Sequence, residues 1–351
     1  MKVSRRELLR TGGAGAAAVV GGGLLGRMVQ ASETPPRRVA QAHGAHGPMG
    51  TVGVVDHARN GFDPSQILYD FDTGEVSTHR GRRVREYTIV AQDKEIEIAP
   101  GLFFPAWTYN GRVPGPTLRA TEGERLRVEF RNGGSHPHTI HFHGIHSARM
   151  DGVPGVGLGD VLPGDTVVYE FDAFPFGCHL YHCHSVPLKR HIHKGLYGAF
   201  IIDPDPARHG EAARPRTLEG AREASIREMV MVMNAFDTNF DGENEVYAVN
   251  TVAFAYVADP IRIRAGELQR AHVINITEFD PINSIHLHAN FFHLYRTGTS
   301  LTPDEFTDTI SMGQAERHMI EFTYREPGRF MFHAHQTEFV DLGWMSFFEV
   351  V

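Results

Sequence analysis

Hydrophobic and polar positions alternate with the period of a β-strand from about residue 85 onward. In the segments 85–91 (REYTIVA) and 125–131 (RLRVEFR), apolar side chains recur at every second position, which predicts strands with one buried face. A stretch rich in glycine and proline at 111–116 marks a loop between them. The main helical pattern is short and covers 218–226. This patterning predicts an all-β protein built from β-sandwiches.

A short histidine motif is repeated along the chain. His-x-His occurs at 141–143 and 182–184, and again at 286–288 and 333–335. The offsets between the two halves are 145 and 151 residues, and four pairs in matched order are not a plausible accident. Since the chain has 351 residues and a domain averages roughly 150, we expect two domains that each contribute two pairs.

The repeat suggests domain boundaries. We expect a first domain at 85–205 and a second at 227–351, joined by a linker at 206–226 that is rich in proline, arginine, alanine, glycine and glutamate. Residues 32–84 are interpreted as a flexible N-terminal arm. Three histidines of this arm (His43, His46 and His57) could scavenge metal weakly, but a solvated linker is the favoured interpretation.

The first 31 residues have the features of an export signal. The segment Ser4–Arg10 (SRRELLR) looks like a twin-arginine motif, an uncharged stretch follows over 11–26, and Val29-Gln30-Ala31 fits a cleavage site. An ordinary secretory signal or an uncleaved anchor is the alternative. No other run approaches the roughly 18 apolar residues that a membrane span needs, so we expect a periplasmic or extracellular protein without a span in its mature form.

Composition points to metal binding. The chain has 22 histidines but only 2 cysteines, so at most one disulfide could form, and neutral histidine is the commonest metal ligand near pH 7. The net charge is −8, and residues 1–31 carry five basic side chains and one acidic one. The acidic remainder, which has no basic tract, argues against nucleic-acid binding.

Strand geometry explains why the histidines come in pairs. Residues i and i+2 of a strand point to the same face, so two His-x-His pairs on neighbouring strands bring four imidazoles together. The first domain would supply His141, His143, His182 and His184, and the second would supply His286, His288, His333 and His335. Eight imidazoles are too many for one metal, so a metal cluster is implied. Imidazole alone suits copper, zinc, iron and nickel.

Cysteine narrows the choice of metal. Cys183 lies between His182 and His184, with His138 upstream and His191 downstream, and one cysteine with two histidines is the trigonal blue-copper set. If Leu196 occupies the axial position, no thioether binds the copper, and an apolar neighbour tends to raise the reduction potential. His193 competes with His191, because the two would share one face of a strand.

Together these motifs resemble those of the multicopper oxidases of the cupredoxin superfamily. The segment 138–144 (HTIHFHG) looks like the family pattern H-x-x-H-x-H-G, the segment 182–196 resembles its H-C-H segment with a later histidine and Leu/Met, and 109–117 (YNGRVPGPT) looks like its entry signature. The likeness covers roughly residues 85–351. It implies two cupredoxin-like Greek-key β-sandwich domains. Because only the first domain has the cysteine, the chain is similar to laccase-like two-domain oxidases, in which domain 1 of one subunit meets domain 2 of the next, usually in a homotrimer.

The resemblance assigns four coppers per chain to specific residues. His138, Cys183 and His191 would bind type 1 copper, with Leu196 axial, and His141 and His286 would bind type 2 copper. The type 3 pair would be held by His143, His182, His184, His288, His333 and His335. His191 is favoured over His193 because Leu196 then falls into the family pattern. The eight-residue spacing from Cys183 to His191 exceeds the usual five and resembles that of copper nitrite reductases.

The resemblance also implies a reaction. Phenolic, aromatic or metal-ion donors would give single electrons to type 1 copper near the edge of His191. The electrons would pass from Cys183 through the backbone to His182 and His184, and four of them would reduce O2 to water. Asp151 and Glu338 are candidates to shuttle protons, although either could be a strand-end or surface carboxylate.

Two other functions and two other motifs are alternatives that the residues also suggest. A copper nitrite reductase has an aspartate where His141 stands and usually an axial methionine where Leu196 stands, and a copper-storage or electron-transfer protein would not need eight cluster histidines. Cys178 is expected to be a small buried residue, since a disulfide to Cys183 would remove the thiolate. The segment 237–242 (DTNFDG) looks like the start of a calcium loop, but position 12 would be Ala248, so a polar hairpin turn is favoured.

Overall fold

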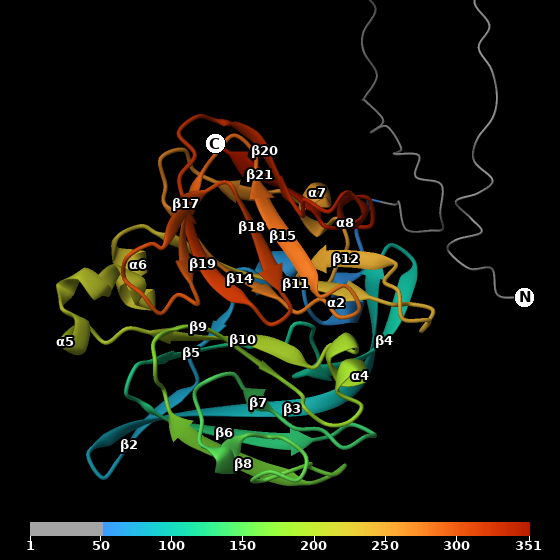
Figure 1. The fold of residues 1–351 in the computed structure, drawn as a ribbon, viewed down its shortest axis with the longest axis vertical. Helices are drawn as coiled ribbons and strands as arrows, with labels where there is room; N and C mark the ends of the chain where they lie inside the picture. The colour runs from blue at the N-terminus through green and yellow to red at the C-terminus, as the bar shows by residue number, and fades with distance from the viewer. Residues whose placement is uncertain (1–51) are drawn as a thin grey trace, which may run out of the picture. The chain divides into compact units, whose positions relative to one another are not determined.

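The computed structural model describes residues 52–351, which form two β-sandwiches (Figure 1). The strands before residue 205 build one sandwich and the strands after residue 226 build the other. The predicted signal peptide and residues 32–51 of the predicted arm lie outside the described residues.

The first sandwich pairs two five-stranded sheets. One has the order β1 (Phe71–Asp72), β5 (Thr117–Thr121), β10 (Tyr197–Asp203), β9 (Gly177–His182) and β7 (His141–Phe142). The other has the order β2 (Glu75–His79), β3 (Arg82–Ala99), β6 (Arg125–Asn132) and β8 (Thr166–Asp172), with β4 (Leu102–Tyr109) paired to β3. The two segments with alternating polarity lie in β3 and β6, which pair in parallel. Side chains of β6 alternate between buried and partly exposed, as the sequence predicts.

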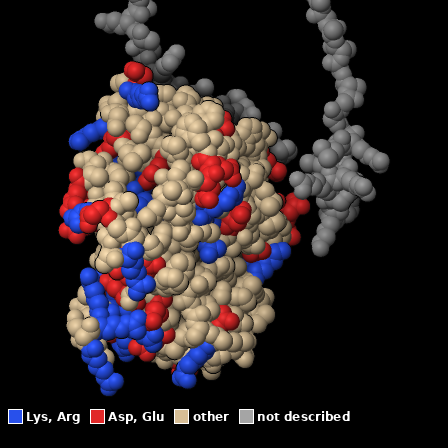
Figure 2. Space-filling model, turned by 60° about the vertical axis from the view of Figure 1, so that its left-hand side comes forward, with Lys and Arg blue, Asp and Glu red and all other residues tan. Residues whose placement is uncertain are grey.

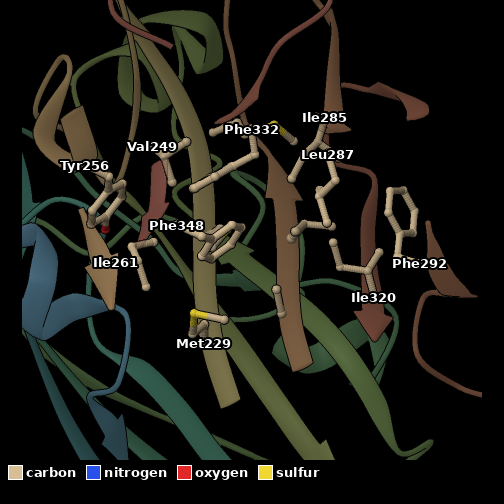
Figure 3. Packing of buried hydrophobic residues seen from close by; sticks show 14 of the residues in the cluster. Met229, Val249, Tyr256, Ile261, Ile285, Leu287, Phe292, Ile320, Phe332 and Phe348 are labelled. Atoms are coloured by element: carbon tan, nitrogen blue, oxygen red, sulfur yellow. The ribbon is translucent and has the colours of Figure 1, made fainter. Parts of the chain in front are cut away.

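The second sandwich repeats this plan with one more strand. Its larger sheet has the order β12 (Val246–Val249), β11 (Arg227–Phe236), β14 (Gln269–Asn275), β19 (Arg317–Phe322), β16 (Phe292–Arg296) and β17 (Glu305–Thr307). The other has the order β13 (Ile261–Ile263), β21 (Met345–Val350), β20 (Gly328–His333), β15 (Ile282–Leu287) and β18 (Thr309–Gly313). Figure 3 shows side chains of both sheets meeting in the core, among them Leu287 and Phe348 of the five-stranded sheet and Met229 and Ile320 of the six-stranded sheet. The same β15 and β20 carry histidines of the second repeat at their ends.

Helices are short and connect the strands. Those that the structure describes are α2 (His57–Asn60), α3 (Pro64–Ile67), η2 (Ala148–Met150), α4 (Leu188–His193), α5 (Pro206–His209), η3 (Glu211–Arg216), α6 (Leu218–Glu223), α7 (Ala255–Ala258) and α8 (Thr337–Asp341). Three of them, α5, η3 and α6, occupy the predicted linker. Thr217 caps α6 by accepting a hydrogen bond from the amide of Gly220. The prediction of an all-β protein is confirmed.

Residues 55–84 fold into helices and strands, so the prediction that they belong to a flexible arm was wrong. They form α2, α3, β1, β2 and the start of β3, and Ile67 and Leu68 are each 1% exposed. The Leu68 carbonyl accepts a hydrogen bond from the amide of Val230 at 2.9 Å, and the Pro64 carbonyl accepts one from the Tyr256 hydroxyl at 2.8 Å. The physical reason is burial of apolar side chains, which is favourable enough to order a segment that turn residues alone would leave mobile.

The two sandwiches share a buried boundary. A single apolar cluster includes Leu180 and Ile201 of the first sandwich and Val230, Val232 and Ile274 of the second. Polar contacts cross the boundary as well, such as the hydrogen bond from the Asn234 side-chain amide to the Tyr197 hydroxyl at 2.7 Å. The relative positions of the two sandwiches are therefore fixed by a continuous core and by specific hydrogen bonds.

Cross-strand ion pairs cover the outer sheet of the first sandwich. Asp172 accepts Arg82 at 2.8 Å and Arg125 at 3.0 Å, and Arg127 contacts Glu86 at 3.0 Å. Figure 2 shows basic and acidic side chains mixed over one face of the protein, with the basic ones gathered most densely at its lower left. Within residues 52–351, none of the helices has the length and apolar character needed to cross a bilayer.

Candidate metal centres

Three buried side chains converge in the first sandwich. The Cys183 Sγ lies 3.2 Å from the His191 Nδ1 and 4.0 Å from the His138 Nδ1, and the two Nδ1 atoms are 3.2 Å apart. The amide of Thr139 donates a hydrogen bond to the Cys183 Sγ at 3.3 Å. Burial raises the pKa of Cys183, while hydrogen bonds from Ser185 and Thr139 lower it. A buried thiolate beside two neutral imidazoles needs a cation, so this donor set fits a copper ion.

Strand pairing places Cys183 and Leu196 side by side. β9 ends at His182 and pairs with β10, which begins at Tyr197, and the amide of Cys183 donates to the Leu196 carbonyl at 2.9 Å. Leu196 is fully buried and belongs to the same apolar cluster as Cys183. The structure therefore puts an aliphatic side chain where the sequence predicts one beside the cysteine.

His191 and His193 lie on α4, not on a strand. Residues two apart on a helix do not share a face, so the expectation that strand alternation could not separate these histidines was wrong. His191 joins Cys183, whereas the His193 Nε2 accepts a hydrogen bond from the amide of Asp237 at 2.9 Å and its ring packs on Phe104. The structure therefore brings His191, and not His193, to the cysteine.

The first histidine set lies where β7 begins and β9 ends. His141 and His182 face each other across this antiparallel pair, the Nε2 atoms of His143 and His182 are 2.9 Å apart, and the rings of His141 and His184 are 5.4 Å apart. The outer nitrogens are held by backbone oxygens: the His141 Nδ1 contacts the Asp151 carbonyl at 2.8 Å, and the His182 Nδ1 contacts the Cys183 carbonyl at 2.8 Å. Such contacts place the proton on Nδ1 and leave Nε2 free to bind a metal.

The second set repeats this arrangement in the other sandwich. His286 on β15 faces His333 on β20, and the Nε2 atoms of His288 and His333 are again 2.9 Å apart. The His286 Nδ1 contacts the Asp308 carbonyl at 3.0 Å, and the His333 Nδ1 contacts the Ala334 carbonyl. The amide of the fourth member, His335, donates to the Ser284 hydroxyl at 2.7 Å, as that of His184 donates to Thr139 at 2.8 Å. The repeat in sequence is thus a repeat in hydrogen bonding.

Each histidine set belongs to one sandwich. Within residues 52–351, every group of side chains whose ligand atoms lie within 4.8 Å of one another and that contains these histidines draws on one sandwich alone. Figure 1 shows β7 and β9 in the lower sandwich and β15 and β20 in the upper one. His288 and His335 are exposed, and His143 is half-buried. Each set therefore presents metal-binding nitrogens toward the surface.

The two candidate proton carriers differ in position. The Asp151 Oδ1 lies 2.9 Å from the His141 Nδ1 and 3.5 Å from the His146 Nε2, so Asp151 adjoins the first set. Glu338 lies in the exposed first turn of α8, where its charge acts on Tyr247. Sequence reasoning missed Asp308, whose Oδ2 lies 3.8 Å from the His286 Nδ1. The repeat gives no signal for it, because Asp308 follows His286 by 22 residues whereas Asp151 follows His141 by 10.

Two other sequence motifs have structural explanations. Cys178 is free and buried, and burial raises its pKa to about 12, which confirms the prediction of a small buried residue. The segment 237–242 lies between β11 and β12, which pair antiparallel. The Asp237 carboxylate accepts hydrogen bonds from the amides of Asp241 and Gly242. The segment is thus a polar turn between antiparallel strands, as predicted, and ligand atoms of Asp237, Asp241 and Glu245 lie within 4.8 Å of one another there.

Buried histidines predict that the copper-free protein loses stability in mild acid. Burial lowers their pKa below the ordinary value near 6.5. The lowered pKa is about 4 for His179, His182, His191, His193 and His272, about 3 for His138 and about 2 for His143. Below about pH 6.5 the unfolded chain binds protons that the folded chain does not, so stability falls as the pH falls, by up to about 1.4 kcal/mol per group and pH unit.

Thermal unfolding of the copper-free protein at about pH 7 and about pH 5 would measure this loss. A variant with the exposed His79 replaced by asparagine should keep the full pH dependence. Equal unfolding temperatures at the two pH values would contradict the prediction.

Comparison with known proteins identifies the family. Two family profiles, each described as "Multicopper oxidase", match residues 91–207 and residues 226–351, which is more than half of the chain. The chain belongs to the multicopper oxidase family. The first matched range contains Cys183 and the first histidine set, and the second contains the other set. The protein is therefore a member of a family of copper-containing oxidoreductases.

Solved structures agree with two cupredoxin-like domains. A protein described as a multicopper oxidase is 55% identical, with a TM-score of 0.79 over 85% of this chain and 100% of that chain. The blue copper oxidase from Nitrosomonas europaea is 27% identical, with a TM-score of 0.65 over 76% of this chain and 86% of that one. The predicted fold class is confirmed.

Curated relatives include nitrite reductases. A probable nitrite reductase–hydroxylamine oxidoreductase fusion protein from Kuenenia stuttgartiensis is 27% identical over 74% of this chain, which covers 30% of that protein. A copper-containing nitrite reductase from Neisseria meningitidis is 26% identical over 72% of this chain and 65% of the relative. Copper resistance protein A from Escherichia coli is 42% identical, but over only 29% of this chain and 17% of the relative. The curated relatives thus include nitrite reductases as well as a copper resistance protein.

Proposed function

We propose that the protein is a laccase-like two-domain oxidase that couples one-electron oxidation of small donors to four-electron reduction of O2. The observation that carries this proposal is the pair of four-histidine sets with matching hydrogen bonds, His141 and His286 included. A single copper with three histidines would not need both sets. Bound copper would supply one-electron transfer at the cysteine site and O2 reduction at the histidine sites.

The chain provides a short covalent route between the two kinds of site. Cys183 is flanked by His182 and His184, and its carbonyl also contacts the His182 Nδ1 at 2.8 Å. One peptide unit therefore connects the thiolate to each flanking imidazole. This arrangement supports electron transfer from the type 1 site to the histidine cluster.

A second copy of the chain would complete the cluster. The two sets lie in different sandwiches of one chain, and members of each are exposed or half-buried. Eight imidazoles could surround one cluster if the first sandwich of one subunit faced the second sandwich of the next. A homotrimer with clusters at its subunit interfaces is the closed arrangement that we propose.

Four protons must reach the cluster for each O2 reduced. Asp151 is placed for this role because its carboxylate contacts His141 and His146. Glu338, which is close to His335 in sequence, is the proposed counterpart in the second sandwich.

The twin-arginine motif at residues 4–10 supports export to the periplasm or beyond.

Copper nitrite reduction is the alternative function, favoured by the curated relatives and by the long spacing from Cys183 to His191. The two functions differ in copper content. We expect four coppers per chain and consumption of O2 with a phenolic donor, whereas the reductase would hold two and convert nitrite to nitric oxide.

Metal analysis, oxygen uptake and nitric oxide detection on the copper-loaded protein would separate the two functions. Purified protein with about two coppers per chain, or without O2 consumption, would overturn the oxidase proposal. An Asp151→Asn variant provides an internal check, because it should slow O2 consumption while the blue absorption band remains.

A further inference from the structure

His191, the copper ligand at which electrons were expected to enter, is covered by other side chains. His191 is 2% exposed, so its edge is not open to a donor as the sequence analysis expected. The indole ring of Trp107 lies over it, with ring centroids 4.8 Å apart. Trp107 also contacts His138, at 5.2 Å between centroids. A single aromatic side chain therefore contacts both histidines of the type 1 site.

Trp107 is itself covered on another side by an exposed histidine. The ring of His136 packs on the indole at 4.6 Å between centroids, and His136 is exposed whereas Trp107 is 5% exposed. The rings of His136, Trp107 and His191 thus form a continuous series of tilted ring contacts from the surface to the cysteine site. No gap wide enough for water separates adjacent rings at these distances.

The chain holds the indole in place from several directions. Trp107 lies on β4, and its amide donates to the Lys194 carbonyl at 2.8 Å. The Arg190 guanidinium lies 5.4 Å from the centre of the indole, and the Lys194 ammonium lies 5.9 Å from it. Both distances are within the range of cation–π attraction. Two cations beside the ring make removal of an electron from it harder, so Trp107 is suited to pass an electron without being oxidised itself.

We propose that electrons enter the type 1 site through Trp107, and that exposed His136 and Arg190 form the contact surface for a small anionic one-electron donor. This inference rests on the proposed function, since it requires copper at the cysteine site. One electron would leave the donor and would be taken up by the copper that His138, Cys183 and His191 would hold. Trp107 begins and ends as a neutral indole, and no bond is made or broken.

Charge favours an anionic donor. Arg190 and its neighbour Lys189 are both exposed on α4. Two carboxylates lie nearby, since Asp93 accepts the amide of Ser135 at 3.0 Å and Asp160 accepts the Ser185 hydroxyl at 2.6 Å. Of the two cations beside the indole, Arg190 lies nearer to the ring centre and is exposed, so it is the cation that an anionic donor at His136 would contact.

The first test measures reduction of the type 1 site directly. The copper-loaded protein is mixed without oxygen with ferrocyanide, and bleaching of the blue absorption band is followed by stopped flow. We expect Trp107→Leu to slow bleaching by about tenfold or more while the position of the band and the reduction potential stay unchanged. Trp344→Phe, which changes the buried tryptophan of the second sandwich, is the matched control and should bleach at the normal rate.

A merely structural role for Trp107 would shift the band or the potential instead of the rate. If Trp107→Leu fails to hold copper, His136→Ala decides the question, because His136 is exposed and can be removed with little effect on folding. Bleaching at the normal rate in His136→Ala would then overturn the proposal, as would an unchanged rate in a blue Trp107→Leu protein.

The second test reverses the charge of the donor. We expect Arg190→Glu to slow bleaching by ferrocyanide about tenfold and to accelerate bleaching by hexaammineruthenium(II), with both effects shrinking at high salt. Arg222→Glu, at an exposed arginine on α6, should change neither rate. If Arg190→Glu is bleached by each donor at the same rate as the parent protein, the assignment of the contact surface is overturned.

Failure of this inference is distinguishable from failure of the proposed function. A protein without a blue band and without four coppers per chain would contradict the oxidase proposal. A blue protein with four coppers, whose bleaching rate does not change when Trp107, His136 or Arg190 is replaced, would contradict this inference alone.

Discussion

Replacing Cys183 with serine is expected to remove the blue absorption band and to lower the rate of donor oxidation by at least about a thousandfold. The Sγ atom lies within 4.0 Å of both His138 and His191, and a serine hydroxyl does not ionise near neutral pH or bind copper as a thiolate does. Loss of the only thiolate should empty the type 1 site, leaving three coppers per chain in place of four. Absorption spectra, metal analysis and oxygen uptake with a phenolic donor measure the three effects.

Cys178→Ser is the matched control for this variant. Cys178 is also free and buried, but it lies in the apolar cluster between the two sandwiches and not beside a histidine pair. Its replacement should leave the blue band and the copper content unchanged, at some cost in stability. If Cys183→Ser stays blue, or if Cys178→Ser loses the band, the assignment of the thiolate is wrong.

The paired histidines were predictable because a local rule governs them. Alternation along a strand aims residues i and i+2 to one side, and the repeat in the second half showed which strands must be neighbours. The observed pairing of His141 with His182 and of His286 with His333 follows from that reasoning. Sequence spacing alone was sufficient here, since both partners lie at the ends of adjacent strands.

The region after Cys183 was not predictable by the same rule. Six residues fold as α4, too few to give a recognisable helical period, so His191 and His193 were placed on a strand. The cover over His191 was also hidden, because Trp107 lies far away in sequence on β4. The ordered segment at 55–84 was missed for a related reason: its apolar side chains have no partners nearby in sequence and pack against distant strands.

Buried charges at the boundary between the sandwiches escaped prediction entirely. Arg119 of the first sandwich contacts Asp203 at 2.8 Å and Glu228 of the second at 2.7 Å. Glu228 also contacts Arg270 at 3.2 Å and His272 at 3.4 Å. All five side chains are almost fully buried. Nothing in the sequence marks these residues as partners, because the ion pairs join positions up to 109 residues apart.

The glutamate at the centre of this cluster, Glu228, is expected to be a position where a single substitution strongly lowers stability. Burial alone would raise the pKa of Glu228, but the charge of Arg119, the hydrogen bond from His272 and the charge of Arg270 outweigh burial and hold the pKa well below its usual range. Glu228→Gln keeps the shape and removes the charge, so Arg119 and Arg270 lose a shared anion in a buried site. Breaking a buried pair in this way costs about 3–5 kcal/mol of unfolding free energy.

Denaturant unfolding of Glu228→Gln measures this loss, and Glu223→Gln is the matched control. Glu223 pairs with Arg214 at 2.9 Å, but both side chains are about half exposed, so its replacement should cost no more than about 1 kcal/mol.

The sign of the pH dependence gives a second check. A carboxyl group with a lowered pKa stabilises the folded chain above its unfolded pKa and loses that effect as the pH falls. The deficit of Glu228→Gln relative to the parent protein should therefore shrink in acid, and a deficit that grows in acid, or one no larger than that of Glu223→Gln, would show that this ion cluster does not hold the two sandwiches together.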